Sequence, residues 1–259
     1  MAVSKAQVKA TNKYNAKKYD SLRIVVPKGR KEAIEAHAQS KGESVNGLVN
    51  ALLRADMGLS AAWTKEEGTR GDLLNKAIIY AVRKHAGAVR KGTSLPYIVH
   101  PMEVAAIVAG ITDDEEVIAA AVLHDTLEDT QTTKEEIIAA FGDRVAALVA
   151  DESENKRENE RPENTWKIRK QETLSHLTGA SHDAKVIALG DKLSNIRAIQ
   201  RDYEAIGEKL WDRFNQKDPA LHGWYYRSIA EILSADETIR ETSAMREYKE
   251  RVSAVFGHC

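Results

Sequence analysis

The stretch that most constrains this chain is an apolar run, residues 117–123, which ends in ionisable side chains. All seven of its residues are small or aliphatic, which predicts a buried helix. His124, Asp125, Glu128 and Asp129 follow it, and such groups at the end of a buried helix need a compensating partner. A divalent metal ion would be that partner. The alternative is a helix end that turns polar as it leaves the core, which we would favour for His124 and Asp125 alone.

The spacing of these four groups favours the metal. On a helix predicted over 115–128, His124 lies one turn from Glu128, and Asp125 one turn from Asp129. The four side chains then form two neighbouring columns. The His-Asp pair can bind a cation while the Glu-Asp pair faces the water that the cation holds.

Length and charge limit the class of protein. A chain of 259 residues suits one large domain with a small appendage. With 38 basic and 39 acidic residues, it is no general polycation for nucleic acid or membranes. The balance is uneven, because nine basic residues but only one acid, Asp20, precede Glu32. Any polyanion should therefore meet the N-terminal end.

Cysteine content and hydropathy predict a cytoplasmic protein without a membrane partner. The single cysteine, Cys259, excludes an internal disulfide and a cysteine-based zinc cluster, and it suits a reducing cytosol. No apolar run reaches the roughly 18 residues of a membrane span. The N-terminus also lacks the apolar core of a signal peptide.

The pattern along the chain predicts four parts. Residues 1–18 form a disordered basic arm, 19–60 a small module, 61–71 a polar linker, and 72–259 an all-α domain. Within the last part, the charged stretch 151–164 is predicted to be a mobile loop. The helices of that domain are predicted at 72–86, 101–110, 115–128, 133–141, 142–152, 163–178, 183–190, 191–202, 218–234 and 237–254.

The small module combines one strand with two helices. Residues 21–26 alternate like a strand that Pro27 ends, and helices follow at 30–40 and, from the cap Ser44, to Gly58. One strand with two helices cannot bury its own faces. We therefore predict a homodimer or higher even oligomer, in which strands of two copies pair into a ribbon.

This module resembles the Arc-type ribbon-helix-helix DNA-binding domains, in residues 21–27 and 42–49. The resemblance implies that Ser21 and Arg23 face base edges in the major groove while the lysine-rich arm contacts phosphates. A dimerisation module without a DNA target has equal weight, because the fold alone does not establish function.

Two further residues complete a candidate metal site in the large domain. His100 precedes Pro101 where a loop enters a helix, and Asp191 follows the apolar residues 186–190. Taken singly, a His beside Pro or an Asp at a helix start is usually a surface or capping residue. Together with His124 and Asp125 they make a mixed nitrogen and oxygen set that suits manganese and leaves positions for water and substrate.

The large domain resembles the HD-domain hydrolases of the RelA/SpoT type, which include small alarmone hydrolases and the metazoan SpoT homologue. The resemblance extends over residues 72–234. The matching motifs stand in the order and spacing of that family, at residues 85–92, 96–101, 124–130, 141–142 and 190–197.

The resemblance implies a role for each of a set of residues. One manganese ion per HD domain would be held by His100, His124, Asp125 and Asp191. The attacking water would lie beside Glu128 and Asp129. Substrate would be bound by Arg90, Lys91, Asn195 and Tyr225. His85 is the rival for the first metal ligand, but His100 holds the His-Pro place of the family.

The implied activity is manganese-dependent removal of the 3′-pyrophosphate from guanosine tetra- or pentaphosphate. Because the chain has no room for a synthetase domain, we expect it only to degrade. One alternative is a phosphatase that acts on another nucleotide, such as NADPH or a nucleoside monophosphate. The other is a DNA-binding regulator whose HD domain senses a nucleotide, which the water-activating pair Glu128 and Asp129 disfavours.

Overall fold

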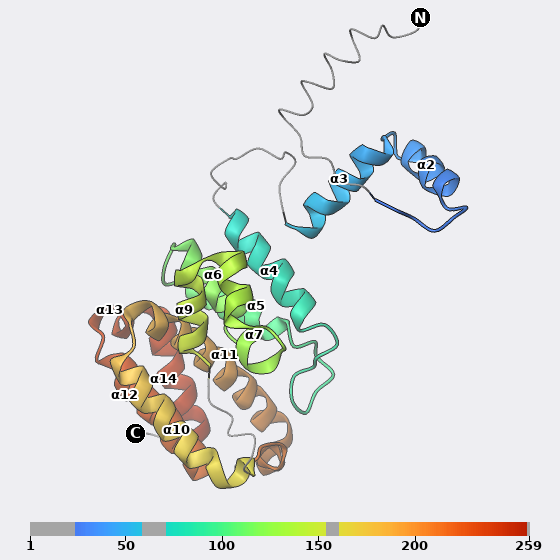
Figure 1. The fold of residues 1–259 in the computed structure, drawn as a ribbon. Helices are drawn as coiled ribbons and strands as arrows, with labels where there is room; N and C mark the ends of the chain where they lie inside the picture. Colours follow the sequence, from blue (N-terminus) through green and yellow to red (C-terminus); the bar gives the residue numbers. More distant parts are fainter. Residues whose placement is uncertain (1–23, 59–70, 154–160, 258–259) are drawn as a thin grey trace, which may run out of the picture. The chain divides into compact units, whose positions relative to one another are not determined.

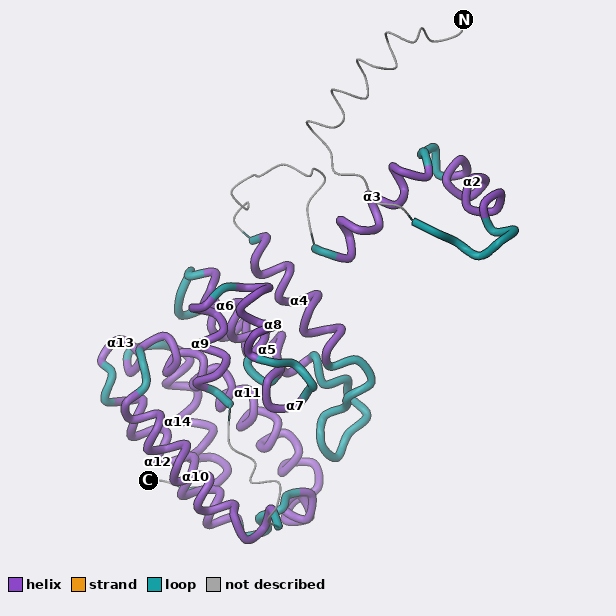
Figure 2. Tube along the Cα trace, in the orientation of Figure 1, coloured by secondary structure: helices purple, strands orange, loops and turns teal. Residues whose placement is uncertain are grey.

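The computed structural model describes residues 24–58, 71–153 and 161–257. Within these ranges the regular structure is helical, apart from an isolated antiparallel bridge between Val89 and Pro96 (Figure 2). The prediction of an all-helical large domain is thereby confirmed for the described residues. The chain divides into two compact units, Met1–Asp56 and Met57–Cys259.

The N-terminal unit contains the two predicted helices, α2 (Lys31–Ser40) and α3 (Val45–Asp56). Gly42 follows α2 with a φ of 72°, a conformation that glycine adopts without strain. The Ser44 hydroxyl accepts a hydrogen bond of 3.0 Å from the Gly47 N–H at the start of α3. Gly42 therefore follows the end of the first helix, and Ser44 caps the second as the sequence predicts.

The strand predicted ahead of these helices is not seen in the part of it that is described. Residues 24–26 belong to no strand, while Ser21 and Arg23 lie outside the described residues, as do the arm 1–18 and residues 154–160 of the charged loop. A β-ladder needs a neighbouring strand, and the sequence places that neighbour in a second copy of the chain. The ribbon-helix-helix module is therefore not confirmed by this single chain.

The larger unit is a bundle of helices. In chain order its described helices are α4 (Asp72–Lys84), α5 (Val99–Ala109), α6 (Glu115–Leu123), α7 (Thr126–Asp129), α8 (Lys134–Phe141), α9 (Asp143–Asp151), α10 (Pro162–Gly179), α11 (His182–Ile206), the 3-10 helix η1 (Gly207–Arg213), α12 (Pro219–Ser234), α13 (Glu237–Arg240) and α14 (Ser243–Phe256).

Helix α6 is the centre of this unit, as its apolar sequence predicts. Every residue from Val117 to Leu123 is buried, and the helix packs against α4, α5, α9 and α11 (Figure 1). It begins at Asp114, whose carboxylate accepts a 3.0 Å hydrogen bond from the Glu116 N–H. Its C-terminal end, which carries His124 and Asp125, is fixed inside the bundle.

The single helix predicted over 115–128 is wrong. Helix α6 ends at Leu123, His124 and Asp125 form a turn, and the short α7 begins at Thr126. The buried Thr126 hydroxyl donates a 2.6 Å hydrogen bond to the Leu123 carbonyl, which competes with a continuous helical ladder. The polar groups therefore do not form the two straight columns of an uninterrupted helix.

The two helices predicted at 183–190 and 191–202 are instead one helix, α11, and Asp191 lies in its middle. Gly190 does not end a helix but lies against α5. A Cβ atom on Gly190 would come within 2.8 Å of Val108 Cγ2 and 3.2 Å of Val104 Cγ1. The missing side chain lets α11 approach α5 closely, which places Asp191 beside His100.

The predicted helix 237–254 is also divided, into α13 and α14. Thr242 starts α14 by accepting a 3.1 Å hydrogen bond from the Met245 N–H, and Asp236 caps α13 in the same way. Such side-chain caps favour a new helix start over continuation of the preceding helix.

We expect Gly190→Ala to lower the free energy of unfolding by about 1–3 kcal/mol, because the added methyl group overpacks the contact between α5 and α11. Chemical denaturation measures the change. Gly179→Ala is the matched control, since a Cβ there meets no atom within 4 Å. Equal stability of the two variants would contradict the close approach at Gly190.

Candidate active site

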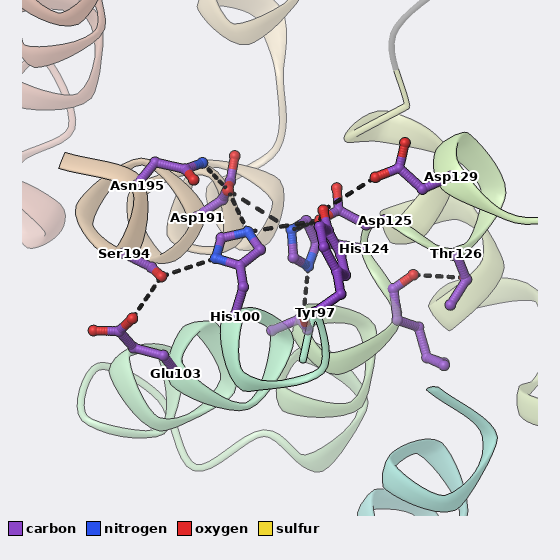
Figure 3. A network of polar contacts seen from close by, with 12 residues as sticks. Tyr97, His100, Glu103, His124, Asp125, Thr126, Asp129, Asp191, Ser194 and Asn195 are labelled. Atoms are coloured by element: carbon purple, nitrogen blue, oxygen red, sulfur yellow. Dashed lines mark hydrogen bonds and ion pairs between the residues drawn. The ribbon is translucent and has the colours of Figure 1, made fainter. Parts of the chain in front are cut away.

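Three segments distant in sequence bring His100, His124 and Asp191 together. His100 lies in the first turn of α5, His124 in the turn after α6, and Asp191 in the middle of α11 (Figure 3). One ligand atom from each lies within 4.8 Å of the others, and all three side chains are buried. The group is one that could hold a metal ion.

Asp125, the fourth predicted ligand, adjoins this group. Its Oδ2 lies 2.9 Å from His124 Nε2 and 3.6 Å from His100 Nε2. On the other side, Asp191 Oδ1 lies 3.0 Å from His100 Nε2 and 3.7 Å from His124 Nε2. Two imidazole nitrogens and two carboxylate oxygens thus point at one another, which is the arrangement of a mixed nitrogen and oxygen metal site.

The hydrogen bonds of the two histidines fit a metal between them. His124 Nδ1 lies 2.9 Å from the Ala121 carbonyl, which can only accept, so this nitrogen carries the proton. When the ring is neutral, as a metal ligand must be, Nε2 is the unprotonated nitrogen. Among the described residues, the buried His124 Nε2 makes no hydrogen bond of acceptable geometry, as is expected of a nitrogen that faces a cation.

Charge in this buried group is balanced internally. Burial alone disfavours a charged His124, but the facing carboxylates of Asp125 and Asp191 outweigh it and raise the pKa of the ring. Burial instead dominates at His100 and lowers its pKa. Burial opposes ionisation of Asp191 as well, yet Lys192 and the two histidines hold the pKa of that carboxyl well below its usual range. A divalent cation would supply the same compensation.

His85, the rival first ligand, lies outside the group of three. Its ring packs on that of Tyr97, with centroids 4.9 Å apart. Burial lowers the pKa of His85, which keeps this ring neutral beside the site. His100 therefore lies in the group that could hold a metal, while His85 packs against Tyr97.

Tyr97 connects the metal group to the predicted water-activating pair. Its hydroxyl lies 2.6 Å from Asp125 Oδ2 and 3.0 Å from Asp129 Oδ2. Burial and the neighbouring carboxylates raise the pKa of Tyr97, so it stays a neutral donor. Glu128 and Asp129 line the same cavity as the metal group, although the helix between them and His124 is broken.

This cavity has a volume of about 400 Å³ and opens beside the predicted substrate residues. Arg90 Nη2 donates a 2.9 Å hydrogen bond to Asn195 Oδ1, and Asn195 Nδ2 donates one of 2.6 Å to Asp191 Oδ1. Tyr225 is buried in the wall, and among the described residues its hydroxyl has no hydrogen-bond partner. Three of the four predicted substrate residues therefore line the same cavity as the metal group.

A second cavity, of about 380 Å³, adjoins the first and contains the fourth residue, Lys91. The cavities share part of their lining, namely Arg90, Tyr97, Lys170, Lys192, Asn195 and Tyr225. The shared wall indicates one continuous cleft. Its distal part combines the basic side chains of Lys91, Arg201 and Arg213 with aromatic rings such as Phe214.

The sequence prediction missed several residues of this cleft. Tyr97 stands inside the quoted 96–101 motif and could have been noticed there, as could Lys192 beside Asp191. Lys170 carries no local signal, because it comes from α10, and only folding places its ammonium 5.0 Å from the Tyr225 ring centroid.

Glu152 is another unpredicted acid in the cavity wall. The residue is half-buried, but its carboxyl group is enclosed, and this burial raises the pKa of Glu152 to about 7 against the opposing charge of Lys192. A raised pKa of an acid in the folded state means that its stabilising contribution is present at low pH and lost as the pH rises toward 7.

We therefore expect Glu152→Gln to raise the Tm of the metal-free protein at pH 8, with the gain shrinking as the pH falls toward 5. Differential scanning calorimetry at several pH values checks this. The control is Asp151→Asn, which removes the same charge from an exposed neighbour. A gain that is independent of pH would show that ionisation of Glu152 is not its cause.

The chain belongs to the HD domain family, whose model matches residues 77–219, more than half of its length. It is 40% identical over 136 residues to the Danio rerio protein named guanosine-3′,5′-bis(diphosphate) 3′-pyrophosphohydrolase MESH1, covering 50% of this chain and 70% of that protein. It is 37% identical over 140 residues to GTP pyrophosphokinase rsh of Brucella ovis, and that match covers 49% of this chain but only 17% of the Brucella protein.

A solved structure extends the similarity to the fold. It is described as a metazoan ortholog of SpoT that hydrolyzes ppGpp and plays a role in starvation responses, and it is 26% identical to this chain with a TM-score of 0.53. The match covers 74% of this chain and 97% of that one. Among the described residues, no helix has the length and hydropathy needed to cross a membrane.

Proposed function

We propose that this protein hydrolyses guanosine tetra- or pentaphosphate and releases the 3′-pyrophosphate. The observation that carries the proposal is a buried His-His-Asp group that shares one cavity with the acids Glu128 and Asp129 and with Arg90. The names of the relatives favour this substrate over other phosphorylated nucleotides.

In this proposal His100, His124, Asp125 and Asp191 hold one Mn²⁺ ion. Nitrogen and oxygen ligands without thiolates suit manganese, and the orientation of the histidines described above supports such a site. When bound, manganese would supply Lewis-acid chemistry, polarising a phosphoryl oxygen and making water easier to deprotonate.

The side chains beside the metal group would accept the proton of the attacking water and orient that water for attack. Glu128 and Asp129 face the cavity, where either carboxylate can accept a proton from the attacking water. The Tyr97 hydroxyl lies 2.6 Å from Asp125 and 3.0 Å from Asp129, and its single proton can be donated to either carboxylate. The attacking water would then lie between this acid pair and the reacting phosphorus.

The basic part of the cleft would bind the substrate. Arg90 and Lys91 would contact phosphates, because a guanidinium and an ammonium offset their negative charge. Asn195 would contact the nucleoside end, and the unpartnered hydroxyl of Tyr225 would find its hydrogen bond with substrate or water. Lys170 and Lys192 join this set as residues of the shared wall.

A substrate screen of the purified full-length protein tests the proposal. Guanosine tetraphosphate, guanosine pentaphosphate, NADPH and nucleoside monophosphates are each incubated with Mn²⁺ or with a chelator, and products are separated by chromatography. We expect GDP or GTP and pyrophosphate, formed only with the metal. Release of orthophosphate from NADPH or a monophosphate would identify a different phosphatase, while binding without turnover would identify a sensor.

For the N-terminal unit we propose an intertwined homodimer, or a higher even oligomer, with DNA as a second ligand of its basic end. Support comes from its apolar side chains, since Ile24, Val25 and Leu52 are 60%, 80% and 61% exposed in the single chain. A second copy that paired with this segment would bury them.

Deletion of residues 1–60 is accordingly expected to lower the oligomeric state while the remaining domain stays folded and active. The reason is that every proposed ligand lies in the larger unit, Met57–Cys259. Light scattering and the pyrophosphate assay measure the two properties. A folded but inactive truncation would show instead that the N-terminal unit is required for turnover.

A further inference from the structure

His100 is held from behind by a buried hydroxyl group. Its Nδ1, the ring nitrogen that points away from Asp191, lies 2.8 Å from Ser194 Oγ (Figure 3). Ser194 is 1% exposed and stands on α11, one turn after Asp191. Helix α11 therefore contacts both nitrogens of the His100 ring, with a carboxylate on one side and a hydroxyl on the other.

The direction of this hydrogen bond follows from its neighbour. Ser194 Oγ lies 2.7 Å from Glu103 Oε2, and a carboxylate can only accept. The single hydroxyl proton of Ser194 therefore points to Glu103, which leaves Oγ as the acceptor for His100. Nδ1 therefore carries a proton and donates it to Ser194. With a cation bound, Nε2 of the neutral ring would present its lone pair to the metal rather than a proton to Asp191.

Glu103 is itself fixed by an ion pair on its other oxygen. Arg197 Nη1 lies 3.0 Å from Glu103 Oε1, so the two carboxylate oxygens have different partners. Arg197 also makes two hydrogen bonds, of 2.8 and 2.7 Å, with Glu247 on α14. The carboxylate that orients Ser194 is thus held by an arginine that a second helix anchors.

The other histidine of the group, His124, is supported by the main chain at the corresponding nitrogen. Its Nδ1 faces the Ala121 backbone carbonyl at 2.9 Å, so its tautomer is set by the main chain. The two histidines reach the same protonation pattern by different means. Substituting the side chains of Ser194 and Glu103 can change the protonation pattern of His100, whereas the backbone carbonyl that faces His124 cannot be removed in this way.

We propose that Ser194 and Glu103 are positioning residues that hold His100 in the Nδ1-protonated tautomer and so present its Nε2 to the metal. Neither residue contacts the reacting atoms in this proposal. The inference rests on the proposed metal centre, and it adds to that centre a relay from Glu103 through Ser194 to the ring.

Glu103→Gln gives the sharpest test in the full-length protein. Its amide oxygen would keep the contact with Arg197, and its NH₂ group would then face Ser194 and donate to it. The serine proton would be freed to point at His100 Nδ1, which favours the opposite tautomer. We expect Mn²⁺ affinity to fall by about 10–100-fold, the range found when the outer partner of a ligating histidine is lost.

The experiment measures Mn²⁺ affinity by calorimetry for Glu103→Gln, Ser194→Ala and the double variant. Long-range ¹H–¹⁵N NMR spectra of the metal-free proteins, with ¹⁵N-labelled histidine, report the His100 tautomer at pH 8. Because Glu103 would act only through Ser194, the double variant should bind Mn²⁺ no more weakly than Ser194→Ala. Ser234→Ala is the matched control, since its part-buried hydroxyl bonds a carbonyl within α12, away from the site.

The outcomes separate the inference from the proposed function. The proposal is supported if Glu103→Gln and Ser194→Ala weaken binding, the control does not, and the ring proton moves off Nδ1 in Glu103→Gln. It is overturned if these variants bind Mn²⁺ like the control or if the ring proton stays on Nδ1 in Glu103→Gln. A wild-type protein that binds no Mn²⁺ would overturn the proposed metal centre itself.

Discussion

Replacing Glu128 by Gln and Asp129 by Asn together is expected to reduce turnover of guanosine tetraphosphate by about 10²–10⁴-fold, the usual contribution of a positioned acid or base. The substitutions keep size and hydrogen bonding but remove basicity. Because neither residue belongs to the group of His100, His124 and Asp191, Mn²⁺ and nucleotide should still bind. Metal content, nucleotide affinity and kcat are measured on the same variant.

A charge-matched control makes this result specific. Glu135→Gln with Asp143→Asn removes the same two charges from exposed positions on α8 and α9. Its turnover should equal that of the wild type. If the double variant at 128 and 129 changes only binding, the domain is a sensor, and if neither property changes, these acids form a solvated helix end.

His124→Ala and Asp125→Ala are each expected to abolish turnover and to weaken Mn²⁺ binding sharply. Each substitution removes one proposed ligand atom from a metal site with few ligands. The two atoms concerned, His124 Nε2 and Asp125 Oδ2, lie 2.9 Å apart. Metal analysis after gel filtration and the pyrophosphate assay check both effects. A variant that kept full activity together with stoichiometric metal would refute the proposed ligand set.

The comparison variant for this experiment is His85→Ala. His85 lies behind Tyr97 and outside the group of three, so we expect this variant to retain bound Mn²⁺. Loss of metal in His85→Ala but not in a His100→Ala variant would reverse the choice between the two histidines.

The sequence was a good guide to which residues meet and a poorer guide to how the backbone brings them together. His100, His124, Asp125 and Asp191 are chemically unusual at the ends of apolar runs, and that contrast made them recognisable. The break at His124 depends on the buried hydroxyl of Thr126, which a periodicity argument does not weigh.

Gly190 shows a second limit of reading the sequence alone. Glycine inside a helical pattern is more often a stop than a contact, because it lowers helix propensity. Here the decisive fact is the proximity of Val104 and Val108 on α5, which only the folded chain supplies. The same holds for Lys170, whose place in the cleft depends on how α10 packs against α12.

The strand at the N-terminal end is a different kind of case. Its proposed partner is a second copy of the chain, so the alternating pattern of residues 21–26 concerns an assembly rather than a monomer. For this reason the truncation experiment, and not the single chain, decides the dimer proposal.

The uninterrupted course of α11 has a practical consequence for redesign. The single helix α11 carries Asp191, Ser194 and Asn195 at helical spacing, while two other residues of the cleft, Lys170 and Phe214, come from α10 and from the residue after η1. A library of variants confined to those two segments could therefore be screened for altered nucleotide specificity while the residues on α11 stay unchanged. Residues of α10 and after η1 can thus be varied, whereas α11 is best kept as it is.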